Sequence, residues 1–143
     1  MHDPVRVLFI CDGNSARSQM AEGLLRTLGG KGFEVRSAGL EVEELNSVAV
    51  KVMQEIDIDI SSQKFHHINE FEDLQFDYVI TLCDQVKDSC LAFPRDIVNL
   101  HWECTDPTEV HGSEVEVIKA YSQARDDIKQ LLEAWLNEEK NNM

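Results

Sequence analysis

Short apolar runs alternate with amphipathic helical stretches along the chain, and this order is what most limits the folds open to it. The first apolar run, Val5 to Ile10, precedes a helical repeat from Arg17 to Leu28 that two glycines end. Further strands are predicted at 33–38, 76–82 and 97–102. Further helices are predicted at 48–56, after an N-cap at Asn46, and at 113–136. This order predicts an α/β fold in which a four-stranded parallel sheet is flanked by helices on both faces.

Length and charge limit the partners of such a fold. The 143 residues suffice for one domain, which we expect to span residues 1–136 with a disordered tail at 137–143. A net charge of −14 argues against nucleic acid and anionic membranes as partners. The first apolar run is too short for a signal peptide, and no run is long enough for a membrane span. We therefore expect a cytoplasmic protein, taken to be a monomer, whose four cysteines need a chemical explanation.

Chemically useful side chains follow three of the predicted strands. Cys11 follows the first strand, Cys83 the third, and Asp106 comes a few residues after the fourth. In parallel sheets, ligands bind beyond the carboxyl ends of the strands, where the strand order changes direction. The sequence therefore predicts a site at this edge of the sheet.

The segment from Cys11 to Ser18 is a Cys-x5-Arg loop between a predicted strand and a predicted helix. Backbone N–H groups of such a loop and the helix N-terminus favour an anion. Arg17 is expected to bind two oxygens of a tetrahedral oxyanion, and the same field favours the nucleophilic thiolate of Cys11. A structural cysteine before an ordinary helix is the alternative reading. The predicted oxyanion-binding residues are Asp12, Gly13, Asn14, Ser15, Ala16, Arg17 and Ser18.

This loop resembles that of the low-molecular-weight protein tyrosine phosphatase superfamily, and the sequence from Val7 to Gly23 looks most like its thioredoxin-coupled arsenate reductases. The resemblance covers nearly the whole chain. It implies a four-stranded parallel sheet, arsenate as the oxyanion substrate, no bound cofactor, and reduced thioredoxin as the electron donor. Other matching segments are Ser37-Ala38-Gly39, Ile58-Asp59-Ile60-Ser61, Thr81-Leu82-Cys83 and Asp106-Pro107.

Cys83 and Cys90 are separated by six residues, the spacing of the reductase pair in this resemblance. Arsenate reduction needs two electrons and hence thiols that end as a disulfide, whereas a phosphatase of this superfamily needs one reactive cysteine. The resemblance implies that Cys11 attacks arsenate, that Cys83 then attacks Cys11 and releases arsenite, and that Cys90 finally attacks Cys83. Two alternatives are free core thiols and a metal site with His101 and Cys104, although the spacing fits no common zinc pattern.

Other residues of the predicted site take their roles from the same resemblance. Asp106 matches the general acid that protonates the leaving oxygen, although an aspartate before a proline is also typical of a turn or a helix cap. Ser18 is expected to hydrogen-bond the Cys11 thiolate. Asn14 is expected to lock the loop by hydrogen-bonding to the loop backbone. Cys104 matches none of the three redox positions and is predicted to be a small buried hydrophobic residue.

The chain also departs from the family pattern. Ala16 stands where many members have a further cysteine, which leaves Cys83 as the matched partner of Cys11. Potassium-binding members hold the cation with residues that match Asn14, Glu22 and Ser37 and with oxygen donors from a later segment. That segment here has Lys64 among its residues, and we hypothesise that the Lys64 ammonium replaces the cation.

Two rival functions remain from the sequence. The first is a protein tyrosine or small-molecule phosphatase that uses Cys11 and Asp106. The pair Thr108-Glu109 after Asp106-Pro107 is not aromatic, which counts against a phosphotyrosine pocket. The second rival is a thiol-based sensor of arsenite or redox state that binds a partner through its cysteines and turns nothing over.

Overall fold

The computed structural model describes residues 4–13, 16–41, 44–71, 75–82 and 97–141. Its strands are β1 (Val5–Gly13), β2 (Phe33–Glu41), β3 (Tyr78–Thr81) and β4 (Val98–His101). Its α-helices are α1 (Arg17–Gly29), α2 (Ser47–Gln54) and α3 (Glu114–Asn141), joined by the short 3-10 helices η1 (Gly30–Gly32), η2 (Ile68–Phe71) and η4 (Pro107–Glu109). The elements follow the predicted order, and only their first and last residues differ from those predicted.

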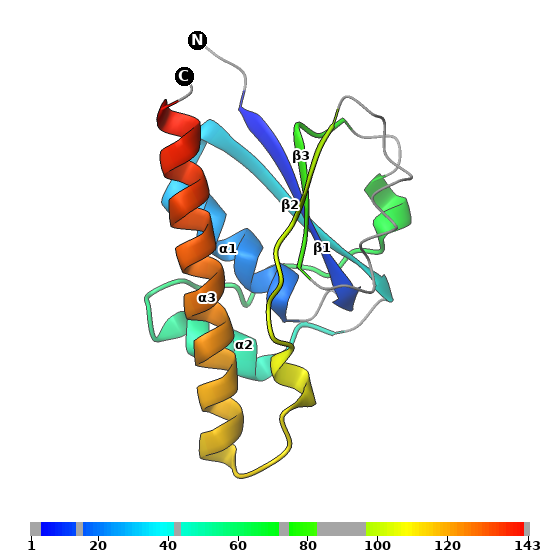
Figure 1. Cartoon of the computed structure of the whole chain (residues 1–143). Coiled ribbons are helices and arrows are strands. Elements are labelled where there is room, and N and C mark those ends of the chain that lie inside the picture. The colour runs from blue at the N-terminus through cyan, green and yellow to red at the C-terminus, as the bar shows by residue number, and fades with distance from the viewer. Residues whose placement is uncertain (1–3, 14–15, 42–43, 72–74, 83–96, 142–143) are drawn as a thin grey trace.

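The four strands form one parallel sheet in the order β2-β1-β3-β4, so the predicted four-stranded parallel sheet is confirmed. The chain leaves β1 for the neighbour on one side, β2, and later returns to the other side with β3. The strand order therefore reverses beside the end of β1, which is where ligands of parallel sheets bind. Cys11 lies at this end, in register with Gly39 of β2, and the ends of β1 and β2 lie side by side at the lower right of Figure 1.

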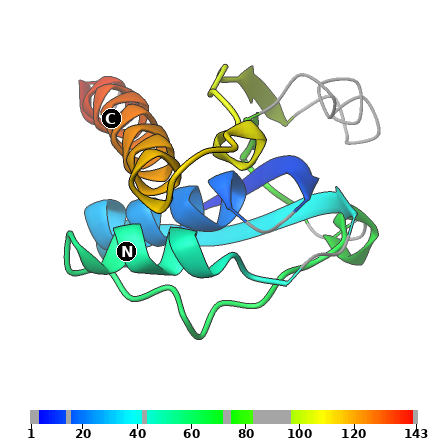
Figure 2. The same ribbon diagram turned by 90° about the horizontal axis from the view of Figure 1, so that it is seen from below.

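The α-helices of the described chain lie on one side of the sheet and the 3-10 helix η2 lies on the other (Figure 2), so the described helices flank both faces, as predicted. α1 packs on β1 and β2, while α3 crosses both α1 and α2. Fully buried side chains, among them Phe9, Met20, Leu24 and Ile128, fill the space between these layers. Close packing explains Gly23 in the middle of α1, since a Cβ atom there would come within 2.5 Å of the Ile60 side chain.

The helix ends follow the signals in the sequence. The Asn46 side chain accepts hydrogen bonds from the backbone N–H groups of Val48 and Ala49, which makes it the N-cap of α2. Gly30 adopts a φ of 61° and donates its N–H to the Arg26 carbonyl, which ends α1 as predicted.

The predicted tail at 137–143 is wrong for its first residues, because α3 continues as far as Asn141. The Tyr78 hydroxyl donates to Glu139 at 2.7 Å, so a side chain of the sheet holds this last part of the helix. Neither the run of polar residues nor its lack of apolar periodicity indicated this contact with a distant strand.

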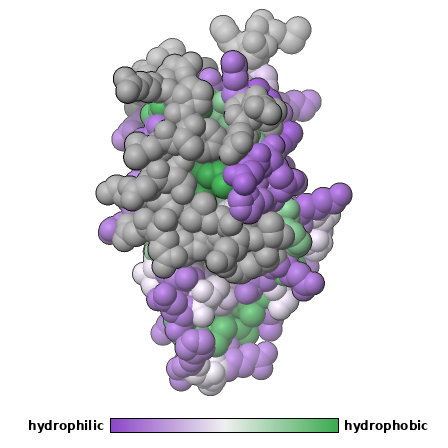
Figure 3. Space-filling view, turned by 90° about the vertical axis from the view of Figure 1, so that its right-hand side faces the viewer, coloured by the Kyte–Doolittle hydropathy of each residue, from purple (hydrophilic) through white to green (hydrophobic). Residues whose placement is uncertain are grey.

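Hydrophilic residues cover most of the described surface on the face shown in Figure 3, with small apolar areas between them. This matches the strongly acidic composition. Within the described ranges, no helix is both long and apolar enough to span a membrane.

Candidate active site

Cys11 follows the buried residues Val7 to Ile10 of β1, and Ser18 lies in the first turn of α1. The Cys11 side chain is 2% exposed, and its Sγ lies 3.1 Å from the Ser18 hydroxyl oxygen in a hydrogen bond. A hydroxyl in this position can donate to the sulfur once it is a thiolate, which stabilises the nucleophilic form. The contact that the resemblance implied for Ser18 is therefore present.

Arg17 is the first residue of α1, and its guanidinium joins three segments of the chain. Nη1 donates to the carbonyl oxygens of Leu82 at 3.1 Å and Cys104 at 2.9 Å, while Nη2 lies 3.5 Å from Asp106 Oδ2. The side chain is only 6% exposed, so these contacts are well shielded from water. Arg17 thereby holds the loop after β4 against the end of β3.

Asp106 serves as a helix cap and as the ionic partner of Arg17 at once. Its Oδ1 accepts from the backbone N–H of Thr108 at 3.0 Å and from the Thr108 hydroxyl at 2.6 Å. The other oxygen faces Arg17, and about a quarter of the side chain is exposed. The interpretation of Asp106 as a helix cap is therefore confirmed, and its carboxyl group lies at the predicted edge of the sheet, where the role of general acid stays a prediction.

The other predicted site residues belong to the loop and to the pair Cys83 and Cys90. Asn14, Ser15, Cys83 and Cys90 lie outside the described residues. The backbone of Asp12 and Gly13 belongs to β1, and buried Ala16 immediately precedes α1, where its carbonyl oxygen accepts from the Met20 N–H. The structure thus brings together Cys11, Arg17, Ser18 and Asp106.

A buried carboxylate lies on the same helix as Arg17. Glu22 accepts from the Ser37 hydroxyl at 2.6 Å through Oε1 and pairs with Arg26 Nη2 at 2.6 Å through Oε2. The hypothesis that Lys64 supplies the cation here is wrong in its residue, because the Lys64 side chain is exposed and the guanidinium of Arg26 is the ionic partner of Glu22. The four-residue spacing of Glu22 and Arg26 on a helix was the sequence signal for this pair.

Arg26 contacts three oxygen atoms among the described residues. Besides Glu22, it donates to the Val35 carbonyl at 3.2 Å and to Gln63 Oε1 at 3.3 Å. The Gln63 amide in turn donates to the backbone and side-chain oxygens of buried Gln19 on α1. This network ties α1 to β2 and to the segment around residue 63, and sequence reasoning did not find the two glutamines because neither lies in a motif.

Two further side chains meet at the ends of β3 and β4. Thr81 Oγ1 lies 2.7 Å from His101 Nδ1, and the two residues are also register partners in the sheet. His66 and His67 are partly buried, and both contact the exposed carboxyl group of Glu70, through the His66 ring and the His67 backbone N–H.

Cys104 packs partly buried against the core, as predicted for a small hydrophobic residue. Burial raises the pKa of its thiol to about 11, and Asp127 and Cys11 add to this rise while Arg17 opposes it. Cys104 therefore remains a protonated thiol at neutral pH, which is the unreactive form.

Replacing Cys104 with serine is expected to change kcat/KM for the oxyanion substrate by less than about twofold, since only its backbone carbonyl contacts Arg17. In the parent chain at pH 7.5, iodoacetamide should modify Cys104 more slowly than the other cysteines, as peptide mapping would show. Rapid modification of Cys104, or loss of activity in the serine variant, would contradict its assignment as a packing residue.

Comparison with known proteins agrees with this geometry. Residues 6–143 match the family model of low molecular weight phosphotyrosine protein phosphatases. The chain is 41% identical over 122 residues to an arsenate reductase of Oceanobacillus iheyensis, a match that covers 85% of this chain and 88% of the relative.

Solved structures show the same relationship. An arsenate reductase in its phosphate-binding state has a TM-score of 0.81 and 30% identity, with 94% of this chain and 98% of that one covered. A thioredoxin-dependent arsenate reductase of Corynebacterium glutamicum has a TM-score of 0.65 and 29% identity, with 94% and 63% covered. The chain belongs to the low molecular weight phosphotyrosine protein phosphatase family.

Proposed function

We propose that the protein is an arsenate reductase that uses Cys11, Cys83 and Cys90 as a thiol relay and reduced thioredoxin as its electron donor. The observation that carries this proposal is that two adjacent residues of α1, Arg17 and Ser18, contact Asp106 and Cys11. The chain that carries them is 41% identical to an arsenate reductase. The cysteine pair Cys83 and Cys90 supplies the two further thiols that a reduction requires and a phosphatase does not.

In the first step, the Cys11 thiolate attacks the arsenic atom of arsenate while the Ser18 hydroxyl stabilises the sulfur. Because two carbonyls hold Arg17 Nη1, the oxyanion binds along the Nε and Nη2 edge of the guanidinium, beside Asp106. Asp106 donates a proton to the leaving oxygen, which departs as water. The product is a covalent Cys11–arsenate adduct in which arsenic is still As(V).

The reduction follows in the second step. The Cys83 thiolate attacks the Cys11 sulfur, the sulfur–arsenic bond breaks, and its electron pair stays on arsenic, which leaves as arsenite, As(III). The two sulfurs are oxidised to a disulfide. The Cys90 thiolate then attacks Cys83 and releases the Cys11 thiolate, and a thioredoxin dithiol reduces the Cys83–Cys90 disulfide. Because thioredoxin and reduced thiols belong to the cytoplasm, we propose that the protein acts there. We further propose that it acts as a monomer on a free oxyanion.

The test measures NADPH oxidation by thioredoxin reductase and thioredoxin with arsenate as the acceptor. We expect multiple turnovers that require arsenate, thioredoxin and the protein together. Hydrolysis of an aryl phosphate without any reductant, combined with no arsenate-dependent oxidation, would identify a phosphatase instead. Binding of arsenite without turnover in either assay would identify a sensor.

Potassium is expected to change KM for arsenate by less than about twofold when it replaces sodium at constant ionic strength, because Arg26 already neutralises Glu22. In Arg26→Met, a buried carboxylate loses its ionic partner, so KM should become potassium-dependent. Lys64→Met is the matched control and should behave like the parent chain. A strong potassium effect on the parent, or one that appears in the Lys64 variant alone, would contradict the role given to Arg26.

A further inference from the structure

A groove runs along α3 beside β4. It consists of two adjoining pockets of about 400 and 340 Å³ that share Leu131 and Ala134 as lining residues. We call it the α3–β4 groove. Its described lining extends along the helix from Asp127 to Glu139, which corresponds to about 18 Å at the rise of an α-helix.

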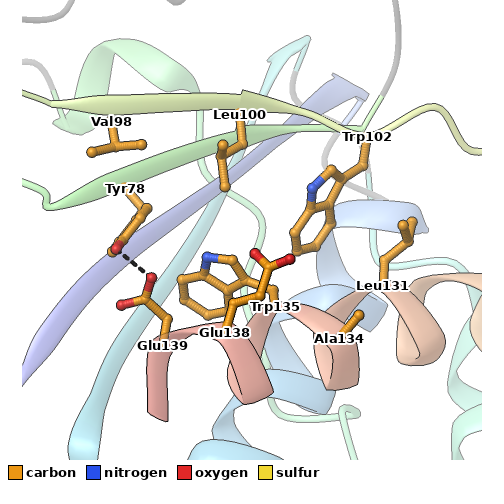
Figure 4. Close-up of a pocket in the computed structure, with 9 residues that line it drawn as sticks. All are labelled: Tyr78, Val98, Leu100, Trp102, Leu131, Ala134, Trp135, Glu138 and Glu139. Carbon is orange, nitrogen blue, oxygen red and sulfur yellow. Dashed lines mark hydrogen bonds between the residues drawn. The ribbon is translucent and has the colours of Figure 1, made fainter. Parts of the chain in front are cut away.

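The wall and floor of the α3–β4 groove are apolar and aromatic. Figure 4 shows Trp135 on α3 between Tyr78 of β3 and Trp102, which directly follows β4. The Trp135 ring meets Tyr78 edge to face at 5.0 Å between centroids and meets Trp102 at 6.4 Å. Val98 and Leu100 of β4 complete this wall, and Val98 is 47% exposed. Water therefore contacts an apolar surface that the described residues do not cover.

The charged residues in the described lining of the α3–β4 groove all have one sign. Glu138 and Glu139 line the first pocket, and Glu103 and Asp127 line the second. No lysine or arginine is among the described residues that line either pocket. Four carboxylates beside aromatic rings attract a cation both by charge and by the electron-rich ring faces.

We propose that the α3–β4 groove binds an extended segment of a partner protein in which basic residues alternate with apolar ones. A length of about 18 Å accommodates five to six extended residues, which is more than a small cation would fill. In an extended segment, alternate side chains point to opposite sides, so apolar residues can face the tryptophans while lysine or arginine residues reach the carboxylates. A second copy of this chain is a poor occupant because each copy carries a net charge of −14.

One end of the α3–β4 groove lies beside the active site. Glu103 and Thr105 line the second pocket and flank Cys104, whose carbonyl oxygen accepts from Arg17. A bound segment at this end therefore contacts the loop that leads to Asp106. The groove thus suits a partner that approaches the protein at the carboxyl ends of the strands.

Tryptophan fluorescence tests this proposal directly, because both tryptophans of the chain line the groove. The probe is an acetylated and amidated peptide of six residues in which lysine alternates with leucine, and its control has glutamate in place of lysine. We expect the lysine peptide to change the emission saturably and the glutamate peptide to leave it unchanged. No saturable change, or an equal response to both peptides, would overturn the proposal.

Two double variants separate binding in the groove from general attraction to an acidic protein. Glu103→Gln with Glu138→Gln removes two groove charges and should weaken peptide binding about tenfold. Glu114→Gln with Glu116→Gln removes two exposed charges near the start of α3, about 16 to 20 Å along the helix from Asp127 at the near end of the groove, and should change peptide binding less than twofold. Equal weakening of peptide binding in both double variants would overturn the proposal. Tryptophan emission that changes with protein concentration in the absence of peptide would also overturn it, because a second copy of the chain would then fill the groove.

Discussion

Replacing Cys83 with serine is expected to abolish multiple turnover of arsenate, with a loss of at least about a thousandfold. The serine hydroxyl is a poor nucleophile toward sulfur, so the Cys11–arsenate adduct has no thiol to release arsenite and form the first disulfide. The Cys11–Ser18 hydrogen bond joins two residues that the substitution leaves in place, so binding of the oxyanion should be preserved. The measurement is thioredoxin-coupled NADPH oxidation, with arsenite counted per protein molecule.

The same variant decides between reductase and phosphatase. Hydrolysis of a phosphate ester needs Cys11 and an acid and no second thiol, so any residual phosphatase activity of Cys83→Ser should equal that of the parent chain. Cys104→Ser is the matched control for removing a thiol and should retain full arsenate turnover. If Cys83→Ser reduced arsenate at the parent rate, the proposed relay would be wrong and Cys83 would be incidental.

Cys90→Ser is expected to stop the cycle one step later. The variant should release one equivalent of arsenite and then accumulate a Cys11–Cys83 disulfide, because no thiol remains to attack Cys83. Peptide mapping of the non-reduced protein identifies this disulfide. Accumulation of a different disulfide, such as one with Cys104, would contradict the order of the relay.

The fold was predictable because its signals are local. Alternating strands and helices, the Asn46 cap and the glycines after α1 are each legible within a few residues, and each was confirmed. The predicted tail failed because the end of α3 depends on a contact between Tyr78 and Glu139, which are 61 residues apart. No short window of the sequence contains that information.

The candidate site divides in the same way. The contact between Cys11 and Ser18 was predictable because the cysteine, the loop and the start of the helix are contiguous in the sequence, and this contact is present. The backbone carbonyls that hold Arg17 could not be predicted, because any residue type provides a carbonyl and only the fold brings those of residues 82 and 104 together. The α3–β4 groove was missed for the same reason, since β3, the segment after β4 and α3 each contribute part of it.

Arg17→Lys is expected to lower kcat/KM for arsenate by about 10² to 10³-fold while keeping the positive charge. The guanidinium anchors Nη1 on two carbonyls and presents its other edge beside Asp106, whereas an ammonium group is a single point that cannot hold these directions together. Lysine would also leave a buried carbonyl without a donor, which we expect to cost about 1–3 kcal/mol of unfolding free energy. Steady-state kinetics and urea unfolding measure the two effects.

Arg36→Lys is the matched control for this substitution. Arg36 also pairs with a carboxylate and donates to a carbonyl, but 43% of its side chain is exposed and its partners, Glu34 and Val35, are its neighbours on β2. Its replacement should therefore change kcat/KM by less than about twofold and stability by under about 0.5 kcal/mol. If Arg17→Lys were equally mild, charge alone would suffice at this position. Binding of the oxyanion would then not require the guanidinium geometry that Arg17 adopts between the end of β3 and the Asp106 loop.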